Sequence, residues 1–185
     1  KDEVKRQITI SGHHDSAKVF NLYIYQPKLY ALRVTGGIGL MAAIFLLTLI
    51  LDIFTLPAVI GTIITIIATI GLLLVLQLWF FVSKKGQLGA GDNLAASASA
   101  IEAGRILSAE RLKNTRIIIA SFDSEEEGLR GVRHYAKKHK DELLKVPTYN
   151  YNMDCVYKVD DMFFLTSDIN GSVKLSKEMA VRCSE

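Results

Sequence analysis

Hydrophobic residues are distributed unevenly along the chain, and two long uncharged runs dominate its first half. No charged residue occurs from Val34 to Leu51 or from Ala58 to Val82. Each run is long enough to cross a hydrocarbon core about 30 Å thick as a helix rising about 1.5 Å per residue. The connector from Asp52 to Pro57 is too short for a domain, so we expect an antiparallel transmembrane hairpin, with helices at about 34–54 and 57–82.

Outside the hairpin, short apolar runs alternate with helical patterns. Runs rich in β-branched residues and aromatics predict strands over 4–11, 116–122, 149–153 and 162–166. Helices are expected to begin at Asp92 and near Val132. This alternation predicts an α/β fold with a mostly parallel or mixed sheet flanked by helices. The hairpin, 34–82, then separates two parts of one domain, 1–33 and 83–185.

Aromatic and basic residues mark one end of the hairpin. Trp79 and Phe80 precede Lys84 and Lys85, and Tyr30 and Arg33 precede the first span. Such residues are typical of the membrane–water interface, and positive charge favours the cytoplasmic side. We therefore expect an integral membrane protein with its polar domain in the cytoplasm.

Charge and cysteine content exclude two other classes of function. The net charge is +3 with dispersed Lys and Arg, which does not suit a nucleic-acid-binding surface. Cys155 and Cys183 are not in a C-x-x-C or zinc-finger spacing. We expect them to be ordinary buried thiols.

Acidic and histidine side chains lie at four strand ends or loop exits. Ligands of α/β proteins gather beyond the carboxyl ends of strands. A metal that hydrolyses peptide bonds requires nitrogen and carboxylate ligands and a nearby general base. These residue types occur together at the following positions: His13, Asp15, Asp92, Glu126, Glu127 and Asp154.

The order of these motifs resembles the co-catalytic zinc aminopeptidase family that includes bacterial leucyl aminopeptidases, glutamate carboxypeptidase II and glutaminyl cyclases. The similar segments are Ser11–Ser16, Gly89–Asn93, Ser124–Gly131 and Asn152–Asp154. The resemblance implies a zinc-exopeptidase-like fold and two zinc ions.

The resemblance also implies a role for each site residue. His13, Asp92 and Asp154 would bind one zinc ion, with Asp92 bridging to the second ion. Glu127 would bind that second ion, and Glu126 would be the general base. Asp15 would orient His13, and His14 would not be a ligand.

This sequence departs from the family in two respects. The second zinc ion of the family also takes a late His, and no His follows Asp154 here. We expect the chain to end before that ligand, so the second site lacks one ligand. The other departure is the hairpin, which lies between the His13 strand and Asp92. It suggests that substrates are membrane-proximal peptides.

The expected function is hydrolysis of a peptide bond, most simply at the N-terminus of a peptide or protein, by a membrane-anchored zinc metallopeptidase. The expected partners are peptide N-termini and the lipid bilayer. The alternative is a catalytically impaired, peptidase-like membrane scaffold or binding subunit. The sequence leaves open endo- or exopeptidase action, the side chain preferred and the oligomeric state.

Overall fold

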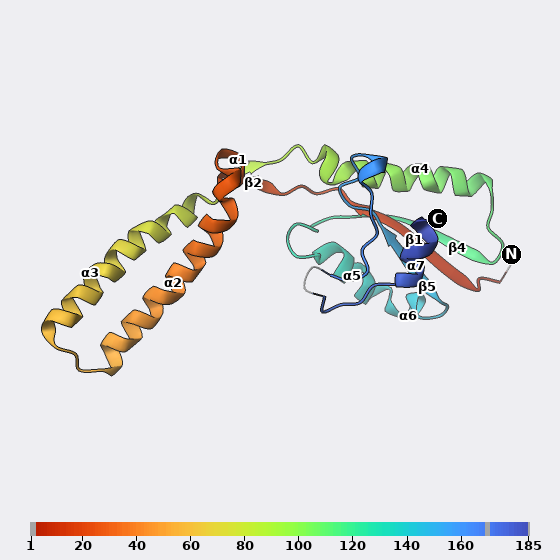
Figure 1. Cartoon of the computed structure of the whole chain (residues 1–185). Coiled ribbons are helices and arrows are strands. Elements are labelled where there is room, and N and C mark those ends of the chain that lie inside the picture. Colours follow the sequence, from red (N-terminus) through yellow and green to blue (C-terminus); the bar gives the residue numbers. More distant parts are fainter. Residues whose placement is uncertain (1–2, 169–170, 185) are drawn as a thin grey trace. The chain divides into compact units, whose positions relative to one another are not determined.

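The structure, a computed structural model, describes residues 3–168 and 171–184 and has a mixed α/β fold (Figure 1). The chain divides into two compact units. One unit combines Lys1–Ser16 with Leu88–Glu185, and the other is Ala17–Gln87. The sequence divided the chain at the ends of the predicted membrane spans, into 1–33, 34–82 and 83–185. The compact hairpin unit is longer than the predicted segment 34–82, because it also includes the strands and short helices at its base.

A parallel sheet forms the centre of the first unit. Its strands are β1 (Arg6–His13), β4 (Thr115–Phe122) and β5 (Thr148–Asn152), in the order β4-β1-β5. β1 pairs with β4 from Arg6↔Thr115 to His13↔Phe122. Consecutive isoleucines favour a strand in β4, because β-branched side chains pack well on a pleated surface. The predicted α/β class with a parallel sheet is therefore confirmed, and the three carboxyl ends lie at one edge.

Helix α4 (Ala95–Ala109) packs against β1 and β4 (Figure 1). Small side chains make this close packing possible: a Cβ on Gly12 would lie only 2.9 Å from the Cβ of Ala96. The remaining helices of this unit are α5 (Arg130–Lys138), α6 (Lys140–Leu143), the 3₁₀ turn η4 (Val159–Asp161) and α7 (Lys177–Ser184).

Two predicted elements differ from the structure. The predicted strand over 162–166 is wrong, because this segment joins no sheet and only an isolated bridge pairs Ser167 with Lys174. At least one of its apolar residues packs against the sheet instead: the ring centroid of Phe164 lies 6.2 Å from that of Tyr151 on β5. Asp92 does not begin a regular helix either. It lies in the turn η3 (Ala90–Leu94) with non-helical φ and ψ, just before α4.

The second unit is a helical hairpin with a small base. Its long helices are α2 (Tyr30–Ile53) and α3 (Ala58–Val75), which pack against each other. A Cβ on Gly71 would lie 3.0 Å from Cδ1 of Ile44, so the glycine allows this close approach. The base consists of β2 (Lys18–Phe20), α1 (Asn21–Tyr25), η1 (Pro27–Leu29), η2 (Leu76–Phe80) and β3 (Val82–Gly86).

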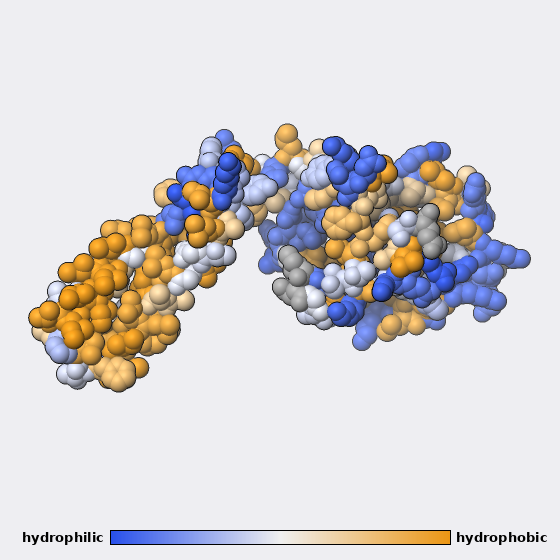
Figure 2. Space-filling model, viewed as in Figure 1, coloured by the Kyte–Doolittle hydropathy of each residue, from blue (hydrophilic) through white to orange (hydrophobic). Residues whose placement is uncertain are grey.

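The hairpin helices expose most of their apolar side chains, as the continuous hydrophobic surface over α2 and α3 in Figure 2 makes visible. The helical segments Pro27–Ile53 and Ala58–Phe80 are long and apolar enough to cross a membrane. Polar side chains in α3 bond within the helix: the hydroxyls of Thr62 and Thr69 donate to the carbonyls of Ala58 and Thr65. The hydroxyls of Thr62 and Thr69 therefore have hydrogen-bond partners within α3 and do not depend on water.

Candidate metal centre

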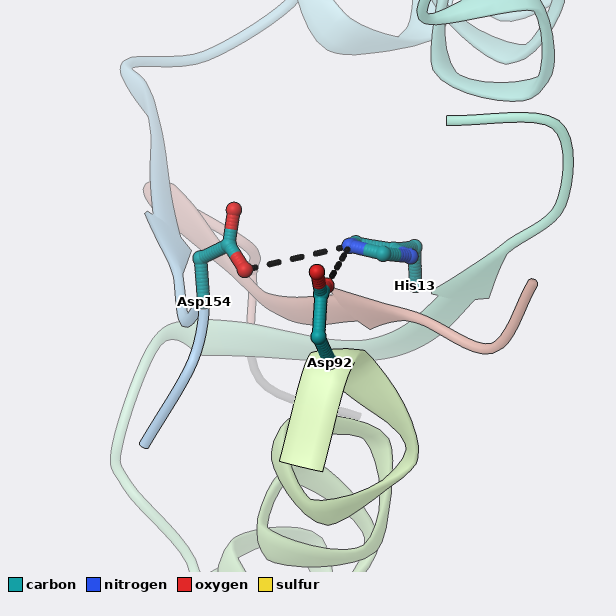
Figure 3. Close-up of side chains that lie close together, drawn as sticks. All are labelled: His13, Asp92 and Asp154. Atoms are coloured by element: carbon teal, nitrogen blue, oxygen red, sulfur yellow. Dashed lines mark ion pairs between the residues drawn. The ribbon is translucent and has the colours of Figure 1, made fainter. Parts of the chain in front are cut away.

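Three side chains converge beyond the carboxyl ends of the sheet (Figure 3). His13 is the last residue of β1 and is only 3% exposed. Its Nε2 lies 3.3 Å from Oδ1 of Asp92 and 3.8 Å from Oδ1 of Asp154. Asp92 comes from the turn before α4, and Asp154 follows the end of β5. The structure thus brings together three residues that the sequence predicted as ligands of one metal ion.

The spacing of these donor atoms fits a zinc ion. Ligand atoms about 2.0–2.2 Å from a tetrahedral zinc ion lie roughly 3.4 Å from one another. The three candidate ligand atoms all lie within 4.8 Å of one another. An imidazole nitrogen with two carboxylates favours zinc or a similar transition metal over magnesium or calcium. The donor set present therefore fits the cofactor predicted from the sequence.

Asp15 contacts the other side of the His13 ring. Its Oδ1 lies 3.3 Å from Nδ1 of His13, and its backbone carbonyl lies 3.2 Å from the same nitrogen. With the ring proton on Nδ1, the lone pair of Nε2 is directed towards Asp92 and Asp154. A carboxylate in this position fixes the tautomer and the orientation of a ligand histidine. The contact is the one that the predicted role of Asp15 requires.

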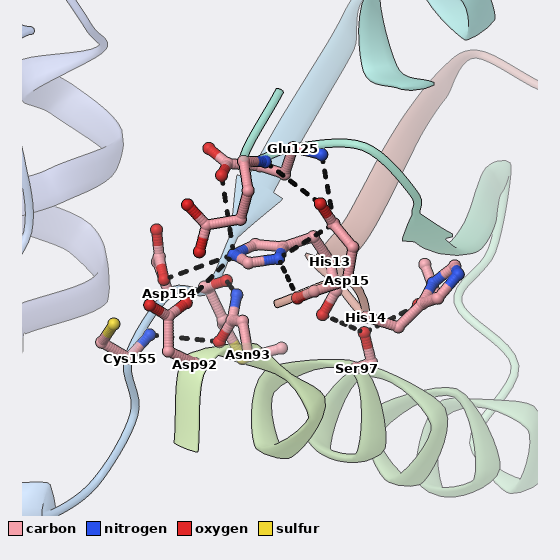
Figure 4. A network of polar contacts seen from close by, with 12 residues as sticks. His13, His14, Asp15, Asp92, Asn93, Ser97, Glu125, Asp154 and Cys155 are labelled. Carbon is pink, nitrogen blue, oxygen red and sulfur yellow. Dashed lines mark hydrogen bonds and ion pairs between the residues drawn. The ribbon is translucent and has the colours of Figure 1, made fainter. Parts of the chain in front are cut away.

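The same carboxylate also holds the loop of glutamates (Figure 4). The backbone N–H groups of Glu125 and Glu126 each donate to a different oxygen of Asp15, both at 3.1 Å. Burial raises the pKa of Asp15, but these two hydrogen bonds, together with the backbone N–H of Asp15 itself and the nearby His13, keep the pKa below its ordinary value. Asp15 is therefore held as an anion that connects the His13 ring to the glutamate loop.

The three consecutive glutamates point in different directions. Oε2 of Glu125 lies 3.9 Å from Nε2 of His13. Burial raises the pKa of Glu126, and the charge of Asp92 raises it further, so Glu126 lies within reach of the charge of Asp92. Glu127 instead pairs with Arg130 at 3.1 Å, and its side chain is 63% exposed. The structure directs Glu125 and Glu126 to the cluster and Glu127 away from it.

Burial also raises the pKa of Glu125, His13 lowers it in part, and the charge of Asp154 raises it again. Glu125 is a residue that the sequence reasoning did not select. Three adjacent glutamates have the same chemistry, and only the path of the loop distinguishes them.

Asn93 links two of the candidate ligands, although it touches no ligand atom. The side chain is fully buried, at 0% exposed. Its Nδ2 donates to the carbonyl of Met153 at 2.9 Å, and its Oδ1 accepts from the N–H of Cys155 at 3.1 Å. The amide thus bonds to the backbone on both sides of Asp154, while Asn93 itself directly follows Asp92. A single sequence has no pattern that predicts these two hydrogen bonds, which we call the Asn93 bracket of Asp154.

A second set of hydrogen bonds holds the end of β1 against α4 (Figure 4). The hydroxyl of Ser97 donates to the carbonyl of His13 at 2.9 Å and lies 2.7 Å from the hydroxyl of Ser121. Nδ1 of His14 lies 2.8 Å from that same Ser121 hydroxyl. His14 therefore bonds to the neighbouring strand, and its role as a residue that binds no metal stays a prediction.

The cysteines and the remaining histidines lie outside the candidate ligand set. The expectation of buried thiols is wrong, since Cys155 and Cys183 are free and exposed. Burial of part of the thiol and the nearby Asp154 raise the pKa of Cys155 to about 11. Nδ1 of His139 lies 3.1 Å from Glu142. Among the described residues, the cluster that fits a metal ion contains His13 with Asp92 and Asp154.

Comparison with known families identifies this arrangement. No curated protein and no solved structure matches the chain. The family model of Peptidase family M28 matches residues 76–183, which is more than half of the sequence. The matched segment includes Asp92, the glutamate loop and Asp154, whereas His13 lies before it. The chain belongs to peptidase family M28.

Proposed function

We propose that the chain is a membrane-anchored zinc metallopeptidase that removes residues from the N-terminus of peptides or proteins. The observation that carries this proposal is the convergence of His13, Asp92 and Asp154 at one edge of the parallel sheet. A chain that had kept the fold as a scaffold would have no need for a buried histidine facing several carboxylates. Membership of a peptidase family supports the same conclusion.

In this proposal the ligand set uses Glu125 and Glu126 rather than Glu126 and Glu127. His13, Asp92 and Asp154 would hold one zinc ion, and Asp92 and Glu126 would hold a second, since the charge of Asp92 already raises the pKa of Glu126. When bound, zinc supplies Lewis acidity that activates water and polarises the scissile carbonyl. Glu127, paired with Arg130, takes no part.

Glu125 is proposed as the general base. Its carboxylate lies next to the His13 ring and is partly shielded from water. Burial raises its pKa, and a raised pKa improves a carboxylate as a proton shuttle. Oε2 of Glu125 would take a proton from the attacking water and pass it to the nitrogen of the leaving amine. Asp15 keeps this residue in position through the hydrogen bond to its backbone N–H.

A free N-terminus is part of this proposal because a neutral terminal amine is a nitrogen donor that zinc accepts as a ligand. The ions that Asp92, Glu126 and Asp154 would hold would therefore also anchor the amine. The hairpin is proposed to cross the membrane twice and to leave the peptidase domain in the cytoplasm, because Lys84 and Lys85 lie at the end where the chain re-enters that domain.

The test is hydrolysis of a peptide with a free N-terminus, compared with the same peptide carrying an N-acetyl group. We expect the purified protein to cleave only the free peptide, to lose activity with a chelator and to regain it with zinc. Cleavage of both peptides would indicate an endopeptidase. No cleavage of either, with zinc bound, would favour the membrane scaffold.

The place of the hairpin in the sequence also supports membrane-proximal substrates. The hairpin unit begins at Ala17, two residues after Asp15 in the chain. In proteoliposomes, a peptide tethered to lipid by its C-terminus should be cleaved with a lower KM than the same peptide in solution. Equal KM values for the two peptides would contradict this part of the proposal.

A further inference from the structure

The base of the hairpin is strongly and uniformly positive. We define the hairpin base as residues 17–33 and 76–87, which precede and follow the long apolar parts of α2 and α3. It contains no acidic residue, and the only acidic residue of the whole unit is Asp52 at the opposite tip. The positive residues of the hairpin base are Lys18, Lys28, Arg33, Lys84 and Lys85.

The hairpin base is an ordered structure rather than a pair of loose linkers. β2 pairs with β3 in antiparallel fashion, with Lys18 opposite Gly86. The rings of Phe20 and Phe81 stack with centroids 5.0 Å apart. Asn21 donates its backbone N–H to the carbonyl of Phe81 at 2.9 Å. These contacts hold the start and the end of the unit together, so positive charges distant in sequence lie on one small element.

The lysines of the hairpin base are free to meet a partner. Lys18, Lys28, Lys84 and Lys85 are exposed, and none of them forms an ion pair with a residue that the structure describes. Arg33 differs, since its Nη1 donates to Oε1 of Gln77 at 3.3 Å. A lysine at a protein surface often has a carboxylate nearby. The hairpin base has none, so its partner must supply the negative charge.

Exposed aromatic rings occur in the hairpin base close in sequence to its lysines. Trp79 is 84% exposed, and Tyr25 and Phe80 are also exposed. Aromatic rings prefer the headgroup region of a bilayer, where one side of the ring meets lipid chains and the other meets water. Lysines next to such rings lie at the depth of the phosphate and carboxylate groups of lipids.

We propose that the hairpin base is a binding surface for anionic phospholipid headgroups, with Lys84 and Lys85 at its centre. The inference rests on the membrane-spanning part of the proposed function and adds a preferred lipid to it. Charge complementarity favours this partner over an acidic protein. The rings and the apolar helices place the lysines against a lipid surface, where each Lys attracts anionic headgroups.

Trp79 is the only tryptophan of the chain and lies within the proposed surface, so it reports on the lipids that touch it. The protein is reconstituted in phosphatidylcholine vesicles containing equal fractions of brominated phosphatidylserine or brominated phosphatidylcholine, because bromine quenches tryptophan fluorescence on contact. We expect phosphatidylserine to associate about fivefold more strongly, the effect of one lysine at an anionic surface. High salt should reduce this preference.

The variant Lys84→Gln/Lys85→Gln should lose at least half of the preference. Lys137→Gln/Lys138→Gln on α5 removes the same charge from the other unit and is the matched control, with the preference retained. Quenching by brominated phosphatidylcholine should be the same in all three proteins, which confirms that each one is inserted and folded around Trp79.

Each other result contradicts a defined part of the account. Equal quenching by both lipids in the wild type would overturn the lipid preference but leave the membrane hairpin intact. A preference unchanged by Lys84→Gln/Lys85→Gln, or lost equally in the control variant, would remove the assignment to this surface. No quenching by either lipid would refute the membrane-spanning hairpin, and the lipid surface with it.

Discussion

One unit of this chain exposes its apolar side chains, whereas the other buries several of its polar ones. In the hairpin, apolar side chains of α2 and α3 are mostly exposed, and threonine hydroxyls bond to carbonyls of their own helix. In the peptidase unit, the most buried large side chains are polar: Gln7, Ser11 and Asn93. The hairpin therefore suits an apolar surrounding, whereas the peptidase unit uses hydrogen bonds to hold a charged site in a fixed geometry.

The largest effect is expected at the glutamates, where the structure separates three residues of identical chemistry. Glu125→Gln should lower kcat about 10²–10⁴-fold, the range for loss of a general base. Glu126→Gln should also lower kcat strongly, because it removes a proposed ligand of the second metal ion. Glu127→Gln should change kcat by less than threefold. Steady-state kinetics on one free N-terminal peptide gives all three values. A large loss with Glu127→Gln would instead support the assignment predicted from the sequence, with Glu126 as the general base and Glu127 as the metal ligand.

The next effect tests the contrast between exposed apolar residues in the two units. Ile66 and Leu144 are both exposed, one on α3 and one after α6. Ile66→Arg should weaken membrane integration by about 2.5–3.5 kcal/mol, or roughly 10²-fold, because it places a charge at the centre of a spanning helix. Leu144→Arg should have no effect. The measurement is the integrated fraction after alkaline extraction. Equal behaviour of the two variants would count against a membrane-spanning α3.

A smaller effect is expected from the buried amide that brackets Asp154. Asn93→Asp keeps the size of the side chain but cannot donate to the carbonyl of Met153. Zinc affinity, measured by competition with a chromogenic chelator, should fall about 10–100-fold, as is usual for residues that orient metal ligands. Asn150→Ala removes an amide on β5 that bonds to Ser11 and is the control. Unchanged affinity in Asn93→Asp would show that Asp154 is positioned without the bracket.

The smallest effect is expected at an exposed ion pair of the peptidase unit. Hydrogen bonds from Arg116 and then from His139 hold the pKa of Glu142 below its ordinary value of 4.5. A depressed folded-state pKa stabilises the fold above the unfolded-state pKa, and this contribution disappears as pH falls through the folded-state value. The Tm of Glu142→Gln should therefore be slightly below that of the wild type at pH 7 and equal to it well below pH 4. A constant difference across this range would exclude the ionic origin.

Much of the fold could be predicted, because its signals are local. The two uncharged runs predicted the hairpin, and the isoleucines of β4 predicted a central strand. The segment 162–166 shows the limit of this reasoning. Its apolar residues fit a strand pattern, but Phe164 packs against Tyr151 and no neighbouring strand is present among the described residues to pair with it.

The site could be predicted as a set of strand ends but not in its detail. Because parallel strands end at one edge, the convergence of His13 and Asp154 followed from the α/β pattern alone. The direction of the glutamates did not, since it depends on which N–H groups reach Asp15 in three dimensions. The bracket formed by Asn93 is likewise a long-range contact, and one sequence has no pattern that encodes it.

The central claim is that the edge of the sheet binds zinc through His13, Asp92 and Asp154, and metal content tests it most directly. Elemental analysis compares the wild type, purified in detergent, with Asp92→Ala. The account predicts at least one zinc ion per chain in the wild type and almost none in the variant, because Asp92 would be a ligand of the ion at this edge. No bound metal in the wild type, or the same content in both proteins, would contradict it.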